Sequence, residues 1–360
     1  MANRCQFWKE YDSVEGSISY CELAAFNRSV NPAFLEQIGC TAEKRKECLG
    51  SMELNIGMGD VPVIASPPPV VCDAPPVIAQ SAVALAEKKA ATHSPSLQLL
   101  ALLAGAYIAL GAVLCTIVTN DLPTYIGDGL SRLVGGMSFS LGLVLVIMGG
   151  AELFTGNNLM VAGFLEKKVS LKQVLNNWGW VYLFNFIGSL VIVFLFFYSG
   201  IWKANDASVA LKAVNTAGAK VSLTWPEAFF RGILCNWLVC LAVWLSMAGK
   251  DAFGKIIGIM IPITAFVAAG FEHSIANMYF IPMGMLLKNQ AILQPMLSAE
   301  IIQNLTWANF LWKNLLPVTL GNLVGGVVFV AAIYWSAYLR PETKVDSAQA
   351  PIGKEIGLKN

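Results

Sequence analysis

Charged residues are scarce in this chain of 360 residues. Asp, Glu, Lys and Arg make up 13% of the sequence, whereas hydrophobic residues make up 56%, and the mean hydropathy is +0.60. Because a soluble domain contains about a quarter charged residues, this composition predicts an integral membrane protein. The net charge of +1 and the lack of a basic run interleaved with aromatic residues give no indication of a nucleic-acid partner.

Other signals are missing as well. The first 30 residues lack an apolar core, so no cleavable signal peptide is predicted. The eight cysteines form neither a CxxC pair nor a Cys/His zinc spacing, so we predict no metal site and no cofactor. The Asn-Pro-Ala tripeptide typical of aquaporin half-helices occurs at residues 31–33, in a charged segment with no span around it. An aquaporin-like pore for neutral solutes is therefore the weaker alternative.

Six hydrophobic runs are each long enough for the ~20 residues that a helical span needs. They cover roughly residues 96–119, 133–165, 174–200, 227–249, 256–287 and 314–339. The second and fifth runs are too long for one span, and each is interrupted by a polar motif. Both are predicted to be a helix, a break and a half-helix, and such breaks are tolerated at membrane depth only where they line a cavity or are buried in protein.

The two interrupting motifs match each other. Residues 150–157 read GAELFTGN and residues 270–277 read GFEHSIAN, so a Gly, a Glu and an Asn recur at the same spacing. A second match follows in each half, because Asn177 and Asn185 have the same separation as Asn314 and Asn322. We therefore predict an all-α fold of six transmembrane helices, built as an inverted three-plus-three repeat with broken helices 2 and 5. Interrupted spans at matching positions in two halves indicate a transport site.

The remaining segments suggest four regions. We expect a polar, weakly ordered N-terminal extension over 1–68, an amphipathic helix within 69–95, a six-span transport domain over 96–340 and a C-terminal tail over 341–360. Lys and Arg are slightly more frequent on the N-terminal side, mainly in the loops 166–172 and 250–255. This bias favours a cytoplasmic location for both termini.

His273 is the only histidine in the predicted spans. With an ordinary pKa of about 6.5, an imidazole is a natural proton donor near neutral pH. It could instead merely hydrogen-bond between helices, but its position at a break favours a role in the pathway. The adjacent Ser274 suggests a nucleophile, yet no third group is placed to orient a base, so we expect a transporter, not an enzyme.

Glu152 and Glu272 are expected to support the breaks. A carboxylate can accept hydrogen bonds from the exposed N–H groups of a following half-helix, and we favour this structural role over proton transfer. Asn157 and Asn277 are interpreted as amide bridges at the same breaks. Thr155 offers a hydroxyl to a substrate oxygen.

Outside the breaks, the assignments are more open. Lys220 ends what reads as a polar loop before span four, where it either attracts anions to a pore mouth or is simply solvated. Asn236, within span four, can hydrogen-bond across helices or to substrate. Apolar constrictions of the pathway, or ordinary packing, are the two interpretations of Phe139, Leu143, Phe154, Val239 and Phe266.

The stretches GAELFTGN (150–157), GILCNWLVCLAVW (232–244) and GFEHSIANM (270–278) resemble the formate/nitrite transporter family, over about residues 70–342. The resemblance implies an aquaporin-like fold, a homopentamer in the bacterial plasma membrane and one pore per protomer. It also implies channel-like or proton-coupled transport of small monovalent anions such as formate, nitrite, acetate and lactate, with formate favoured over nitrite. By motif position it makes His273 the central histidine, Thr155 the loop threonine, Lys220 the mouth lysine and Asn236 the pore asparagine. The five apolar residues named above fall at the family's constrictions.

Overall fold

The structure is a computed structural model that describes residues 8–13, 16–21 and 72–340. Residues 1–69 and 70–360 form two compact units. In the first, strands β1 (Trp8–Ser13) and β2 (Gly16–Cys21) pair antiparallel, from Trp8 opposite Cys21 to Ser13 opposite Gly16. The predicted extension, the tripeptide at 31–33 and the C-terminal tail lie largely or wholly outside the described residues.

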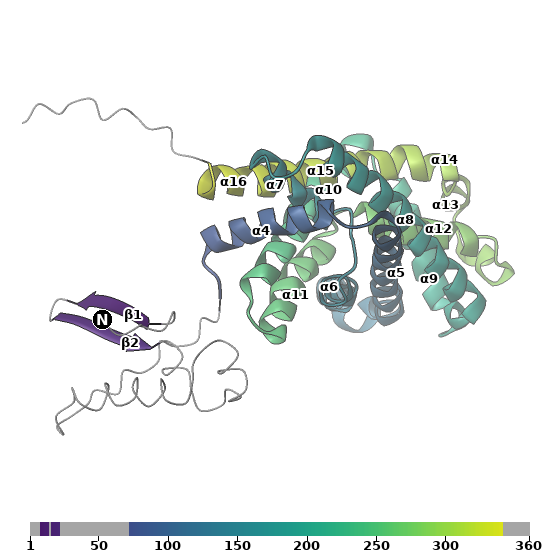
Figure 1. Ribbon diagram of the computed structural model, residues 1–360. Helices are drawn as coiled ribbons and strands as arrows, with labels where there is room; N and C mark the ends of the chain where they lie inside the picture. Colours follow the sequence, from purple (N-terminus) through teal and green to yellow (C-terminus); the bar gives the residue numbers. More distant parts are fainter. Residues whose placement is uncertain (1–7, 14–15, 22–71, 341–360) are drawn as a thin grey trace, which may run out of the picture. The chain divides into compact units, whose positions relative to one another are not determined.

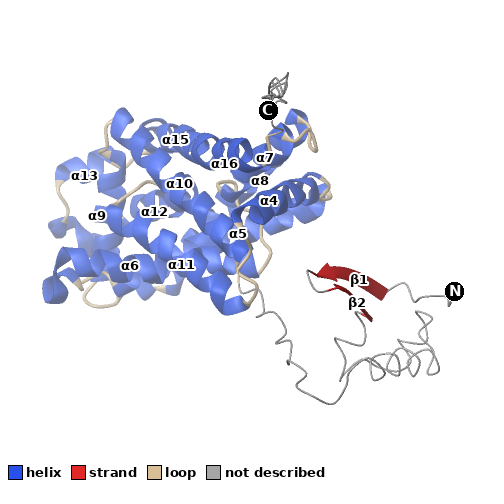
Figure 2. Cartoon of the chain, turned by 90° about the vertical axis from the view of Figure 1, so that its left-hand side faces the viewer, coloured by secondary structure: helices blue, strands red, loops and turns tan. Residues whose placement is uncertain are grey.

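The second unit is a helical bundle with six helices long and apolar enough to cross a membrane. Figures 1 and 2 show short helices at its two ends, with α4, α7 and α16 at one end and α9 and α13 at the other. The elements that carry the six spans and the two breaks are α5 (Ser94–Val118), α6 (Pro123–Met148), η1 (Gly156–Leu159), α7 (Met160–Leu165), α8 (Leu171–Ser199), α10 (Trp225–Ala248), α11 (Ala252–Ala269), α12 (Ser274–Leu287), α14 (Trp307–Asn309), η4 (Phe310–Leu315), α15 (Leu316–Gly326), η5 (Val327–Ala332) and α16 (Ile333–Tyr338).

The sixth span runs continuously from α14 to α16 and contains two π-helical turns, η4 and η5. The other elements of this unit are α4 (Pro75–Ala90), η2 (Ile201–Lys203), α9 (Ser208–Val221), η3 (Ala291–Met296) and α13 (Ala299–Asn304). The six predicted spans and the two broken helices are thus confirmed, with the helix ends shifted by a few residues in most cases. The second span differs most, because α6 begins at Pro123 and contains a non-helical Gly127.

Both breaks begin at a glycine with a left-handed backbone. Gly150 follows α6 with φ of 74°, and Gly270 follows α11 with φ of 76°. Residues with a Cβ rarely adopt this conformation, whereas glycine does so at little cost. Each glycine ends the first helix and turns the chain into the extended segment that carries the Glu of its motif.

Glycines also bring the spans close together. A Cβ at Gly188 of α8 would overlap the carbonyl oxygen of Leu102 on α5, and a Cβ at Gly325 of α15 would overlap that of Ile233 on α10. Close approach at small residues is how membrane helices gain packing contacts. The α5–α8 and α10–α15 crossings occupy matching positions in the two halves, which the inverted repeat requires.

The segment before α4 is fixed to the loop between α10 and α11. The Asp73 amide donates to the Ala248 carbonyl at 2.9 Å, and Lys250 forms an ion pair with Asp73. Cys72 pairs with Gly249 in an isolated antiparallel β-bridge. The segment before α9 makes a similar connection in the other half, where the Asn205 side chain donates to Asn120 and Asp121. The repeat therefore includes α4 and α9 as well as three spans in each half.

Candidate functional site

His273 lies at the second break, where α12 begins. The residue is buried, and its Nδ1 accepts a hydrogen bond from the Ala276 amide at 3.2 Å, so the imidazole caps the helix. Its Nε2 lies 2.9 Å from the hydroxyl oxygen of Thr155, which belongs to the first break. The two breaks therefore meet through one side-chain hydrogen bond.

This geometry assigns the protons of the pair. Because Nδ1 accepts from a backbone N–H, the hydrogen of the neutral ring sits on Nε2 and is donated to Thr155. The threonine hydroxyl hydrogen then remains available to a further acceptor. A second proton on Nδ1 would face the Ala276 N–H, so the ring must release the helix cap before it becomes an imidazolium.

Glu272 is the centre of a buried polar network beside His273. Its carboxylate accepts from Lys220 Nζ at 2.8 Å, from Asn277 Nδ2 at 2.7 Å and from Asn314 Nδ2 at 3.2 Å. Asn322 completes the arrangement, because its Nδ2 donates to the Glu272 carbonyl and its Oδ1 accepts from the Ser274 amide. The amide side chains thus satisfy the backbone that the break exposes.

Glu152 has the same surroundings at the first break. Its carboxylate accepts from Lys89 Nζ at 2.7 Å and from Asn157 Nδ2 at 2.7 Å, and Asn157 also donates to Asn177. Asn185 donates to the Glu152 carbonyl and accepts from the Phe154 amide. Each of these contacts has a counterpart in the Glu272 network, where Asn277 likewise donates to Asn314. Of the Glu272 contacts, only the bond from Asn314 to the carboxylate is unmatched, because Asn177 Nδ2 has no partner among the described residues. The inverted repeat therefore extends to individual hydrogen bonds.

These hydrogen bonds correct two expectations. The carboxylates of Glu152 and Glu272 do not cap the following half-helices; Asn185, Asn322 and His273 accept the backbone N–H groups instead. Lys220 does not end a loop, because it belongs to helix α9. Its ammonium forms an ion pair with Glu272, and the side chains of the two residues are 14% and 6% exposed.

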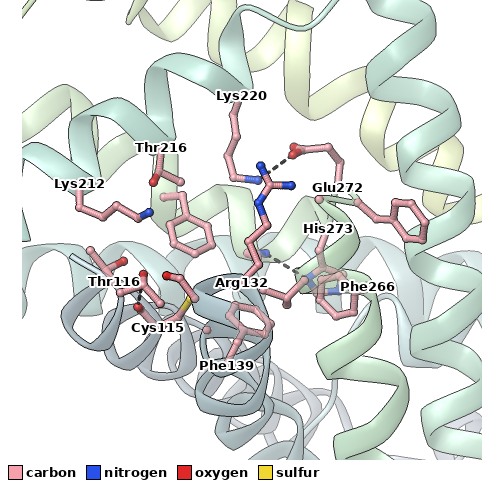
Figure 3. A pocket seen from close by; sticks show the side chains of 18 of the residues that line it. Cys115, Thr116, Arg132, Phe139, Lys212, Thr216, Lys220, Phe266, Glu272 and His273 are labelled. Atoms are coloured by element: carbon pink, nitrogen blue, oxygen red, sulfur yellow. Dashed lines mark hydrogen bonds and ion pairs between the residues drawn. The ribbon is translucent and has the colours of Figure 1, made fainter. Parts of the chain in front are cut away.

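A cavity of about 280 Å³ leads to this network and is shown in Figure 3. Three cationic residues line it, Arg132, Lys212 and Lys220, together with the acids Asp128 and Glu272. His273, Phe139 and Phe266 belong to the same lining. The rings of Phe139 and Phe266 meet edge to face with centroids 5.8 Å apart, and Phe266 lies 5.9 Å from the imidazole.

Comparison with known proteins agrees with this geometry. The family model described as "Formate/nitrite transporter" matches residues 76–336. This chain belongs to the formate/nitrite transporter family. A relative named "Probable formate transporter" from Methanothermobacter thermautotrophicus is 44% identical over 272 residues, which cover 71% of this chain and 94% of the relative. "Formate channel FocA" of Escherichia coli (strain K12) is 39% identical over 256 residues, covering 70% and 90%.

Solved structures show the same family fold. A structure titled "Pentameric formate channel with formate bound" is 37% identical with a TM-score of 0.62, covering 69% of this chain and 98% of that chain. A structure titled "FNT family ion channel" is 31% identical with a TM-score of 0.63, covering 72% and 98%. The family, the six-span inverted repeat and the placement in a membrane are therefore established for this chain.

The other proposed constriction residues of this family member lie apart from the cavity. Leu143 and Val239 are buried in the main hydrophobic core. Phe154 is buried as well, but its ring packs against Trp178 and Tyr182, with centroid distances of 6.1 and 4.8 Å. It lines a separate apolar groove between α8 and the sixth span.

Asn236 of α10 is buried and forms hydrogen bonds to residues of the first break, which belongs to the other half of the repeat. Its Nδ2 lies 2.7 Å from Asn158 Oδ1 and from the Asn322 carbonyl, and 3.4 Å from the Thr155 carbonyl. The Cys240 thiol also donates to the Thr155 carbonyl. In this structure Asn236 positions the threonine loop and does not line the cavity.

Sequence reasoning missed several residues of the site. Lys89 was interpreted only as part of a surface helix, although Lys89 and Leu100 have the same spacing as Lys220 and Arg231, and the Leu100 and Arg231 carbonyls accept equivalent amide hydrogen bonds. Extending the repeat toward the N-terminus would have paired Lys89 with Lys220. Arg132 and Lys212 belong to no motif, and in the sequence they contribute only to the distribution of Lys and Arg that indicates orientation.

The His273–Ser274 pair is not arranged for nucleophilic catalysis. Both ring nitrogens of His273 are occupied by Thr155 and the Ala276 amide. The Ser274 hydroxyl is buried and has no hydrogen-bond partner among the residues that the structure describes. A base in contact with the hydroxyl, which an activated serine requires, is not provided by this imidazole.

Proposed function

We propose that this chain forms a membrane channel for formate and related small monovalent anions, namely nitrite, acetate and lactate. The observation that carries the proposal is the His273–Thr155 contact at the end of a cavity with three cationic residues. Ionisable groups at membrane depth usually serve a pathway. The names of the relatives, which include a probable formate transporter and a formate channel, support formate as the substrate.

In the proposed pathway the anion first enters the cationic cavity. The positive residues raise the local concentration of monovalent anions at the mouth. The anion then passes the rings of Phe139 and Phe266 and meets the hydrogen-bond donors of His273 and Thr155. The Nε2–H of the ring and the free hydroxyl hydrogen are both suited to a carboxylate oxygen.

A proton transfer completes the proposed mechanism. After the ring gains a proton, the imidazolium gives its Nε2 proton to the carboxylate, which leaves neutral imidazole and neutral formic acid. A neutral acid crosses the apolar surroundings of Leu143, Phe154 and Val239 at far lower cost than the anion, because burying an unpaired charge is expensive. The ring is then protonated only on Nδ1. Water in the cavity takes this proton and returns one to Nε2, which restores the starting tautomer and the helix cap for the next cycle.

The proposal extends to the assembly and the location of the protein. We propose a homopentamer with one pore in each protomer, supported by the solved relative whose title describes a pentameric formate channel. We place the protein in the bacterial plasma membrane with both termini cytoplasmic, and assign it no enzymatic activity.

The test is stopped-flow uptake of formate, nitrite, lactate and water into proteoliposomes over a series of pH values. We expect the protein to accelerate uptake of the three anions and to leave water permeation close to that of empty liposomes. Water flux without formate flux would overturn the proposal in favour of an aquaporin-like pore. A nitrite rate well above the formate rate would instead identify a nitrite-preferring member of the family.

A further inference from the structure

Two cations in the cavity have no acidic partner among the described residues. Lys220 forms an ion pair with Glu272, whereas Arg132 and Lys212 form no ion pair or hydrogen bond with any residue in the described part of the chain. Arg132 is exposed on α6 and Lys212 is half-buried on α9, and both line the cavity. Figure 3 shows the two side chains extending toward the same space.

Hydroxyl groups accompany these cations on the same two helices. Ser131 is 2% exposed and lines the cavity, and its hydroxyl has no hydrogen-bond partner among the described residues. Thr216 also lines the cavity, four residues from Lys212 and four from Lys220. Because residues four apart lie on one helix face, α9 presents Lys212, Thr216 and Lys220 as a row.

We infer that Arg132, Lys212, Ser131 and Thr216 form a separate anion-binding station, occupied before the anion reaches Phe139 and Phe266. The ligand is a planar monoanion with two oxygens, a small carboxylate or nitrite. A guanidinium can bind such an anion with two parallel hydrogen bonds, which a spherical chloride cannot match. Asp128, the remaining acid in the lining, lowers the positive charge of the station and favours a single bound anion at a time.

The inference extends the proposed function, because it adds a second binding step to the same pathway. It also predicts an anion-binding property of the cavity that can be measured without transport. Anions must accumulate in this cavity, and a bound carboxylate must shield the groups that share its lining. Cys115 is half-buried and lines the same cavity, so its thiol is a reporter within the native chain.

The experiment labels the purified, detergent-solubilised protein with methanethiosulfonates that carry either a sulfonate or a trimethylammonium group. Mass spectrometry of the peptide containing Cys115 gives both rates. We expect the ratio of anionic to cationic labelling to fall about fivefold in Lys212→Gln, the effect of removing one nearby charge from a partly solvated cavity. Formate should slow labelling at lower concentration than chloride does.

Two further variants test the station specifically. Lys203→Gln removes a cation that lies over the Trp202 ring and does not line the cavity, so its labelling ratio should match wild type. Arg132→Lys keeps the charge but loses the guanidinium, so protection by formate should weaken toward that by chloride. In proteoliposomes, Lys212→Gln should raise the half-saturating formate concentration about fivefold, with the maximal rate little changed.

Equal labelling ratios in Lys212→Gln and Lys203→Gln would overturn the inference, as would formate protection no better than chloride protection in the wild-type protein. The labelling experiment tests the anion-binding station independently of transport. If formate protects Cys115 but no formate crosses the membrane, the station holds and the proposed function fails. If formate crosses and Cys115 is unprotected, the function holds and the station does not.

Discussion

At the scale of single residues, His273 joins the two halves of the repeat. Its Nδ1 caps α12 and its Nε2 contacts Thr155, so the same ring ends one break and reaches the other. Since the ring cannot accept a second proton on Nδ1 without releasing the Ala276 amide, protonation is coupled to the start of α12. In the proposed mechanism, the residue that handles the proton is therefore also part of the helix-capping structure.

Thr155 supplies the hydroxyl that faces His273. Thr155→Val keeps the shape but removes the hydrogen bond, and we expect formate flux to fall about tenfold, the effect of one hydrogen bond worth about 1.4 kcal/mol. Thr155→Ser keeps the hydroxyl and serves as the matched control, with flux within about twofold of wild type. Uptake rates in proteoliposomes check both. Equal loss in the two variants would assign the residue a packing role.

At the scale of elements, each break depends on a Lys–Glu–Asn network. Lys220→Gln leaves the Glu272 carboxylate buried without its cation, and removing one partner of a buried ion pair costs about 3–5 kcal/mol. We expect a clear fall in the thermal unfolding midpoint of the detergent-solubilised protein. Lys220→Gln combined with Glu272→Gln should recover part of that loss, because no unpaired charge remains.

Two comparisons control this prediction. Lys172→Gln changes an exposed lysine at the start of α8 and should leave the midpoint unchanged. Lys89→Gln should cost about as much as Lys220→Gln, because Lys89 forms the equivalent ion pair with Glu152. A double variant less stable than Lys220→Gln alone would contradict the account of the network.

Much of this element-level organisation could be predicted from sequence. The spans follow from long apolar runs, and the breaks follow from polar motifs that repeat at one spacing. Helix α9 could not be recognised by the same criterion, because residues 208–221 are too short and too polar for a span. The spacing of Val209, Ala213, Val214, Ala217 and Val221 does indicate a buried helix face.

The direction in which each side chain points could not be predicted from the sequence. Phe154 and Ser274 occupy matching positions in the two motifs, yet one ring packs against Trp178 and Tyr182 while the other position carries a small hydroxyl. Whether a given apolar side chain faces a cavity depends on neighbours that the chain brings together from several spans. For the same reason, the sequence did not show that Asn185 and Asn322, and not the Glu carboxylates, accept the backbone N–H groups at the breaks.

At the scale of the whole molecule, the transport unit begins close to residue 70. Contacts divide the chain after Pro69, and the connection to the α10–α11 loop starts at Cys72 and Asp73. A variant lacking residues 2–69 keeps this connection, so we expect formate uptake within about twofold of the full chain. Its unfolding midpoint should also be retained.

A longer deletion provides the control. Removing residues 2–74 also removes Asp73, its ion pair with Lys250 and its hydrogen bond to Ala248, and thus frees the start of α4. We expect a lower unfolding midpoint, since α4 carries Lys89 to Glu152. If the shorter deletion alone abolished uptake, the first unit would have to be part of the transport machinery.

The measurement that tests the central claim most directly compares wild type with His273→Asn for coupled formate and proton uptake in proteoliposomes between pH 5 and 8. Asn can still cap α12 through its side-chain oxygen, but it carries no titratable proton. For wild type we predict formate uptake that rises as the pH falls and is accompanied by proton uptake. In His273→Asn, the rate of formate uptake should not depend on pH, and formate uptake should no longer be accompanied by proton uptake. Wild-type pH dependence and proton uptake in the variant would contradict the account.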